Sequence, residues 1–231
     1  MMRVLVPLAI LEGESVSPGL IDLLGTMDVT VLGYQRLPEQ TPPDQARAQF
    51  EERATSALED VAEEFRAAGG AADHRLVFTP DRRQSIERVG ADVGATAYAV
   101  NGATGTVERL LVPLSGDVAV DRILEFVAAL VGDRDIGVTL LVVGDDTATS
   151  ERLEDAAAQL EAAGVDVATE RGTGNPFDAL VESVPGHDAI VMGQRAPSLA
   201  SLVWGEEADR VAAASVGPVL VVRRDDEADT G

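Results

Sequence analysis

The chain has 231 residues, 40 of them acidic and 18 basic, and its formal net charge at pH 7 is −22, so we expect neither nucleic acid nor an anionic membrane as a partner. All basic residues are arginines and cysteine is absent, which excludes a P-loop lysine, a Schiff base, thiolate chemistry and disulfides. No apolar run reaches the roughly 20 residues of a bilayer span, so we expect a cytoplasmic protein without direct membrane insertion.

Short apolar runs alternate with helical patterns along the first hundred residues, which is typical of βαβ units with parallel strands. A long helix is predicted near 44–68, with Pro42 and Pro43 at its start. The strands predicted in this half lie near 2–8, 28–34, 75–79 and 95–100.

The same alternation continues through the second half. Asp117 is predicted to cap a helix, Gly164 to end one in a left-handed conformation, and Pro176 to occupy a first helical turn. The helix near 118–132 is apolar on most sides, so we expect it to be buried. Strands are predicted near 109–114, 137–143, 165–170, 188–193 and 218–222, and helices near 118–132, 149–163, 175–185 and 199–214.

The two halves repeat one design. Arg3–Leu8 (RVLVPL) recurs as Arg109–Leu114 (RLLVPL), and three further motifs recur in the same order. Only six residues separate Gly102 from Arg109, so the first half lacks its last helix and strand. We therefore predict four strands in residues 1–106, five in residues 107–224, and a disordered acidic tail over 225–231.

Acid-rich chains without lysine are typical of the cytosol of salt-accumulating archaea. Near 1 M salt the Debye length falls to about 3 Å, which removes the self-repulsion of such a surface. An arginine-for-lysine bias in a GC-rich genome is the alternative, but this bias alone does not account for the net charge.

The run from Asp188 to Arg223 contains an apolar strand, a loop with glycines, a helical pattern and a last strand. In nucleotide-binding α/β proteins such a loop wraps phosphates. The run resembles the C-terminal half of a universal stress protein domain, whose loop has Gly, two residues, Gly, nine residues, Gly and Ser or Thr. The resemblance implies a tandem of doubly wound parallel sheets, Rossmann-like and similar to the adenine nucleotide alpha hydrolases.

The phosphate loop departs from the family pattern. Gly193 holds the first glycine position, but Ala196 replaces the second glycine. Eight residues then lead to Gly205, one fewer than in the family, and Glu206 replaces the Ser or Thr. The acid that the family usually has after its first strand is missing from both halves. By position, a retained nucleotide site would use Val143, Met192, Gly193 and Gly205.

Several local features have two interpretations. Glu206 and Glu207 either satisfy a helix dipole or hold a divalent ion that restores nucleotide binding. The segment Gly102–Thr106 is either a turn into the next strand or a remnant phosphate loop. For the remaining candidates the structural interpretation is favoured. His187 is expected to be a surface turn residue, and Asp145 and Asp146 solvated acids. Trp204 is expected to be a core or interface anchor rather than the cover of a pocket.

No catalytic constellation appears, and the two histidines stand in no metal-spaced cluster. The resemblance implies a stress-linked regulator that acts through protein partners and is not an enzyme, with weak or no ATP binding. The alternative is a sensor that binds ATP or AMP, and an enzyme on the same scaffold is a third hypothesis. Family versions appended to transporters suggest a membrane transporter as a partner, and the strand near 218–222 suggests a homodimer.

Overall fold

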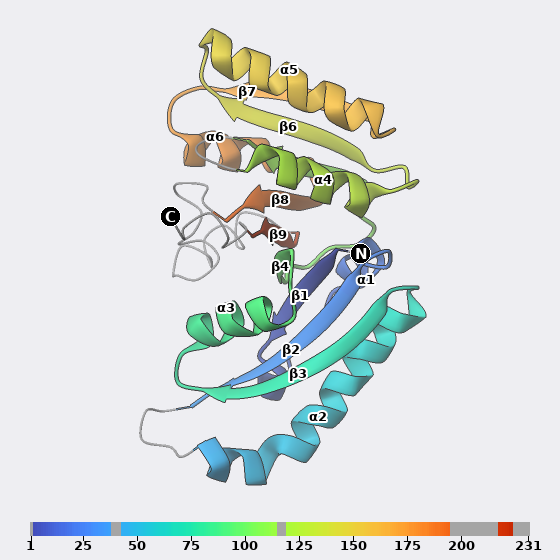
Figure 1. The fold of residues 1–231 in the computed structure, drawn as a ribbon, viewed down its shortest axis with the longest axis vertical. Coiled ribbons are helices and arrows are strands. Elements are labelled where there is room, and N and C mark those ends of the chain that lie inside the picture. Colours follow the sequence, from blue (N-terminus) through green and yellow to red (C-terminus); the bar gives the residue numbers. More distant parts are fainter. Residues whose placement is uncertain (1, 38–42, 115–118, 195–216, 224–231) are drawn as a thin grey trace. The chain divides into compact units, whose positions relative to one another are not determined.

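The computed structural model describes residues 2–37, 43–114, 119–194 and 217–223, with the side chains of 43–45 left out. Contacts divide the chain into two compact units, Met1–Asn101 and Gly102–Gly231 (Figure 1). Each unit is an α/β structure with a parallel sheet. None of the helices described combines the length and the apolar character that a bilayer span requires.

The first unit has four strands among its described residues, as predicted, in the order β3-β2-β1-β4. Strand β3 begins four residues earlier than predicted, because the polar start of this strand hides it from a search for apolar runs. Two short helical elements and α3 were not predicted. The elements are β1 (Arg3–Leu8), η1 (Ile10–Glu12), α1 (Pro18–Leu23), β2 (Asp28–Arg36), α2 (Pro43–Ala67), β3 (Ala71–Thr79), α3 (Arg82–Asp92) and β4 (Ala97–Val100).

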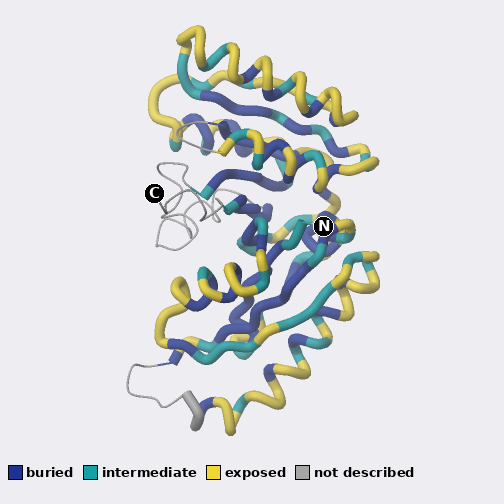
Figure 2. The backbone as a smooth tube through the Cα atoms, in the orientation of Figure 1, coloured by how far each residue is buried: buried dark blue, intermediate teal, exposed yellow. Residues whose placement is uncertain are grey.

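Helix α2 packs closely against the sheet of the first unit. Its buried residues are spaced along one face: Ala46, Ala54, Leu58, Ala62 and Phe65. A Cβ on Gly33 of β2 would lie only 2.6 Å from Leu58 Cδ1, so the absence of a side chain at Gly33 lets the helix approach. Figure 2 shows the corresponding pattern of a buried inner face and an exposed outer face along α2.

The second unit has five strands among its described residues, as predicted, in the order β9-β8-β5-β6-β7. The predicted strand 137–143 matches β6 at both ends, and no other boundary of a described element differs by more than two residues. The helix predicted near 199–214 lies outside the described residues. The elements are β5 (Arg109–Pro113), α4 (Val120–Val131), β6 (Gly137–Val143), α5 (Thr147–Ala162), β7 (Val167–Gly172), α6 (Pro176–Ser183), β8 (Ala189–Gly193) and β9 (Val219–Val222).

Two of the three predicted helix ends are confirmed. Gly164 has φ +86° after α5, and the Val165 N–H donates to the Leu160 carbonyl over 3.1 Å. Pro176 lies in the first turn of α6, after an asparagine cap. The third prediction is wrong in position: the N-cap of α4 is Ala119, without a side-chain cap, and Asp117 lies outside the described residues. The apolar face of α4 is buried, as predicted.

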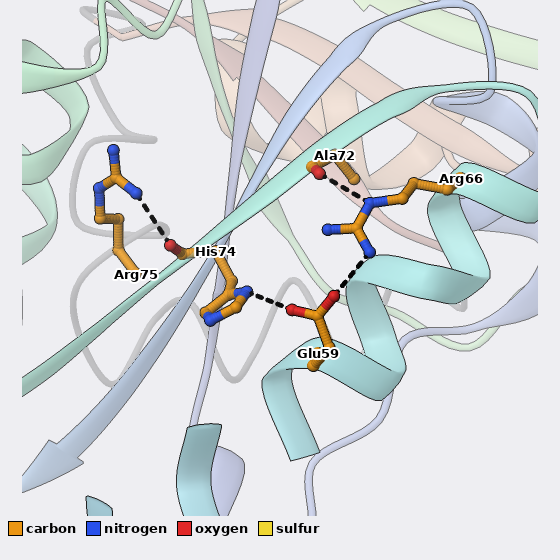
Figure 3. Close-up of polar contacts among 5 residues, drawn as sticks. All are labelled: Glu59, Arg66, Ala72, His74 and Arg75. Atoms are coloured by element: carbon orange, nitrogen blue, oxygen red, sulfur yellow. Dashed lines mark hydrogen bonds and ion pairs between the residues drawn. The ribbon is translucent and has the colours of Figure 1, made fainter. Parts of the chain in front are cut away.

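An ion-pair network joins α2 to the amino half of β3 (Figure 3). Glu59 accepts from Arg66 Nη1 over 2.8 Å and contacts His74 Nδ1 at 3.0 Å. The same Arg66 donates through Nε to the Ala72 carbonyl over 3.0 Å, and Arg75 Nη1 donates to the His74 carbonyl over 3.0 Å. Arginine side chains therefore occupy backbone acceptors at this end of the strand.

The Glu59 carboxylate gives a testable dependence of stability on pH. The hydrogen bond from Arg66 is the main reason that the pKa of Glu59 lies below its ordinary value of 4.5. A lowered pKa stabilises the folded state above the unfolded-state pKa, and this contribution disappears as pH falls through the folded pKa. We expect wild type to unfold at a higher temperature than Glu59→Gln at neutral pH, with the difference shrinking below about pH 4.5. A difference that is constant with pH would contradict this role.

Candidate functional site

In an open parallel sheet, ligands bind past the carboxyl ends of the strands, where the strand order reverses. In the second unit the order reverses between β5 and β8. The chain leaves these two strands into residues 115–118 and 195–216, which lie outside the described residues. Of the predicted nucleotide site, the structure therefore describes only the carboxyl ends of the strands and not the loops that follow β5 and β8.

Three of the four predicted site residues lie at this edge. Met192 and Gly193 are the last two residues of β8 and are buried, and Val143 is the half-buried last residue of β6. The two strands flank β5 on either side, so the structure brings these residues to one end of the same sheet. The fourth predicted residue, Gly205, lies outside the described residues, as do Ala196, Trp204, Glu206 and Glu207.

The central strand of this edge offers no acidic side chain among the described residues. Leu114 follows β5 directly, is 1% exposed, and donates its N–H to the Leu141 carbonyl over 2.8 Å. What the described residues present here is an apolar floor with a glycine at its end. These residues can pack against a flat apolar group, and the acids described at this edge are Asp145 and Asp146, which follow β6.

The first unit places polar groups at its corresponding edge. Its strand order reverses between β1 and β4, and the chain leaves β1 through η1. Glu14 then folds back, and its Oε2 accepts from the Ala9 N–H over 2.7 Å. Gly13 makes this return possible with φ +80°. A carboxylate from the chain itself thus occupies the backbone donor at the end of β1.

Sequence reasoning missed Glu14 because it looked for an acid directly after the strand. The acid lies six residues after Leu8, and only the turn at Gly13 returns it to the strand end. The pair Gly13-Glu14 shortly after an apolar strand is the sequence signal that could have indicated it.

Other polar groups surround this loop. Asn101 Nδ2, just after β4, donates to the Ser15 carbonyl over 2.7 Å. The Arg82 guanidinium lies 4.9 Å from the ring centroid of Tyr34, near the end of β2. Burial raises the pKa of Tyr34 above 10.0, opposed by Arg82 and reinforced by Glu14. The arrangement can hydrogen-bond, but it contains no nucleophile with an adjacent base.

The candidate phosphate loop at Gly102–Thr106 has a packing explanation. A Cβ on Gly102 would meet the Gly217 carbonyl oxygen and would lie 2.8 Å from Pro218 N. Gly105, in contrast, has open space where a Cβ would be. The close approach of two backbone segments favours the structural interpretation of Gly102 over the phosphate-binding one.

The acidic pair after β6 has a capping role through its second member. Asp146 is the N-cap of α5, and its carboxylate accepts from Thr149 N over 2.9 Å and from Thr149 Oγ1 over 2.7 Å. These hydrogen bonds lower the pKa of Asp146. No group of three or more potential metal-ligating acids or histidines occurs among the described residues.

His187 is more than the surface turn residue predicted from sequence. Its ring is half-buried and bridges two elements, with Nδ1 2.8 Å from the Ser183 carbonyl and Nε2 2.8 Å from Thr139 Oγ1. Since a carbonyl only accepts, Nδ1 must carry the proton, and Nε2 accepts from Thr139 in the neutral ring. The histidine therefore connects α6 to β6.

An open cavity of about 470 Å³ lies on the second unit at the amino ends of β5, β6 and β7. This is the edge opposite the predicted nucleotide site, and none of the predicted site residues lines it. Its charged residues are Glu108, Arg109, Asp135 and Asp166.

The comparisons with known proteins support one family. Residues 143–223 match the model of the universal stress protein family. A universal stress protein from Archaeoglobus fulgidus is similar in structure, with a TM-score of 0.69 at 19% identity over 97% of each chain. A search of curated proteins found no match.

Two further solved structures share the fold at lower similarity. A functionally unknown protein from Pseudomonas aeruginosa has a TM-score of 0.55 at 14% identity, over 97% of this chain and 93% of the other. The cytoplasmic domain of a prokaryotic cation chloride cotransporter has a TM-score of 0.54 at 13% identity, over 95% and 94%. The match to the universal stress protein family is therefore confined to residues 143–223, while the fold is shared with a solved universal stress protein over nearly the whole length of the chain.

Proposed function

We propose that this chain is a non-enzymatic, cytoplasmic regulatory or interaction protein of the universal stress type, with weak or no ATP binding. The observation that carries the proposal is the 2.7 Å hydrogen bond from the Ala9 N–H to Glu14. It puts a carboxylate of the chain at the switch point of the first unit, where it opposes a phosphate. The replacements at Ala196 and Glu206 support the same conclusion for the second unit.

A nucleotide sensor is the second candidate function, and one observation favours it. Strand β8 ends in Met192 and Gly193 beside the central strand β5, so an apolar floor and a backbone without a Cβ lie together at the switch point. An adenine ring packed on Met192 and Val143, with phosphates near Gly193 and Gly205, would use this geometry. Glu206 would then need a divalent ion beside it.

Thermal unfolding in molar KCl with Mg-ATP, AMP and other adenine nucleotides separates the two functions. A ligand at 100 times its dissociation constant stabilises a protein by about 2.7 kcal/mol, which is readily detected. We expect no shift of the midpoint at millimolar nucleotide. Magnesium salt without nucleotide is the control, and a nucleotide-dependent rise would establish the sensor instead.

The double variant Ala196→Gly with Glu206→Ser tests whether the loop alone is responsible. If the rest of the site is intact, restoring the family residues should produce a nucleotide-dependent shift that wild type lacks. If no shift appears, the site is lost elsewhere, and the end of the first strand is the leading location.

For the partner, the sequence predicts a membrane transporter or a second copy bound through the strand near 218–222. The likeness to the cytoplasmic domain of a cation chloride cotransporter is one of fold alone. Within the second unit, Val219–Val222 forms one of the two outer strands and pairs with β8. Both partners stay predictions.

A further inference from the structure

Strand β3 is one of the two outer strands of the first unit, so one side of its backbone faces no other strand of that unit. Successive residues of a strand direct their N–H and C=O groups alternately to the two sides. The Thr79 carbonyl accepts from the Leu37 N–H, on the side of β2. By alternation, Leu76 and Phe78 direct their backbone groups outward, as do Ala72 and His74.

The outward side is blocked at one end and open at the other. The Ala72 and His74 carbonyls accept from Arg66 and Arg75 in the network of Figure 3. The outward groups of Leu76 and Phe78 have no hydrogen-bond partner within the part of the chain that the structure describes. Unpaired groups on an outer strand are a template for another strand.

The open end carries apolar side chains on both faces of the strand, since successive side chains point to opposite faces. Leu76, Val77 and Phe78 are consecutive, uncharged and all half-buried. Strand β7, an outer strand of the second unit, differs because it carries Glu170 and Arg171 in its carboxyl half. Charged residues on an outer strand discourage pairing, and β3 has none between Arg75 and Thr79.

The open segment of β3 is complementary to itself. In an antiparallel pair with a two-fold axis at Val77, Leu76 lies opposite Phe78 of the other copy, and Phe78 lies opposite Leu76. Both residues direct their backbone groups outward, so each of these pairs exchanges two hydrogen bonds. Val77 lies opposite Val77 of the other copy in a non-hydrogen-bonded pair, the position in which opposing side chains lie closest. Arg75 lies opposite Thr79, so no like charges meet.

We propose that a second copy of this chain pairs with the segment Leu76–Thr79 of β3, antiparallel and two-fold symmetric about Val77. This places the homodimer at β3 in place of the strand near 218–222, and it holds whether or not nucleotide binds. Each copy carries a net charge of −22, so long-range repulsion opposes the pairing at low salt. The dimer therefore strengthens as KCl is raised towards molar concentration.

Sedimentation velocity of the full chain, over a concentration series at low and molar KCl, measures the pairing. Val77→Glu and Val77→Arg each place two like charges opposite one another at the axis. We expect either variant alone to weaken dimerisation about tenfold or more, and an equal mixture of the two to recover it as a heterodimer. Recovery in the mixture cannot come from a misfolded variant, because a folding defect is not repaired by a second defective chain.

Val167→Glu on β7 is the matched control, since it adds the same charge at a half-buried valine of the other outer strand. It should leave the dimer unchanged. The proposal is overturned if wild type stays monomeric at high concentration in molar KCl. It is also overturned if the dimer persists in both Val77 variants, which would place the interface elsewhere, such as 218–222.

Discussion

Replacing Phe126 by alanine is expected to lower the free energy of unfolding by about 3–5 kcal/mol, the largest effect that we predict. Phe126 is 0% exposed in the centre of α4, a helix whose buried face also contains Leu124, Val127 and Leu130. Removing the ring leaves a cavity that the surrounding side chains fill only in part. Urea unfolding in molar KCl, which screens the net charge, measures the change.

The neighbouring residue provides the control for this prediction. Glu125 is exposed on the outer face of the same helix, so Glu125→Ala removes a side chain of the same helix without opening a cavity. We expect a change within about 0.5 kcal/mol. If Phe126→Ala were as mild as Glu125→Ala, the burial of α4 in the second unit would be in doubt.

Gly102→Ala is expected to destabilise the second unit by about 1–3 kcal/mol. The added Cβ would meet the Gly217 carbonyl oxygen and would lie 2.8 Å from Pro218 N. These are backbone atoms, which cannot rotate away as the end of a flexible side chain can. The segment before β5 or the segment before β9 must therefore move. Urea unfolding of the variant measures the loss.

Gly105→Ala is the matched control, because nothing lies within 4 Å of a Cβ built there and its backbone needs no positive φ. The pair also tests function. If Gly102–Thr106 were a phosphate loop, both substitutions would alter a nucleotide-dependent shift in stability while leaving the unliganded protein similar. If Gly102 is a packing glycine, only Gly102→Ala changes the unliganded protein.

The strands were the most predictable part of the fold. Parallel strands buried on both sides appear as continuous apolar runs, and β6 (Gly137–Val143) matches its predicted ends for this reason. Where that condition fails, so does the prediction. Strand β3 begins with Ala71, Ala72 and Asp73, because an outer strand needs no apolar residue on its exposed side. Helix α3 was missed because its core contacts rest mainly on Ile86 and Val89.

The candidate site was predictable only as far as its strand ends. The resemblance to the family's nucleotide site predicted Met192, Gly193 and Val143, and the structure places them at one edge of the second sheet, where carboxyl ends of parallel strands meet. The resemblance did not indicate Glu14, because the return of that side chain to Ala9 depends on one turn at Gly13. The carboxylate moves to the strand end through a backbone conformation, which a motif search does not represent.

By itself, the sequence determined the α/β class, the tandem repeat with four and then five strands, and a charge that disfavours polyanions. These properties follow from local periodicity and composition, which each segment carries independently of its neighbours. Only the tertiary structure decided that Gly102 packs against the backbone of Gly217 and Pro218. It also decided that Glu14 accepts a hydrogen bond from the Ala9 N–H. Finally, it placed the side chains of Arg66 and Arg75 on backbone carbonyls in the amino half of β3. These contacts depend on which groups the folded backbone brings within hydrogen-bonding or van der Waals distance, and the order of residues along the chain does not specify those distances.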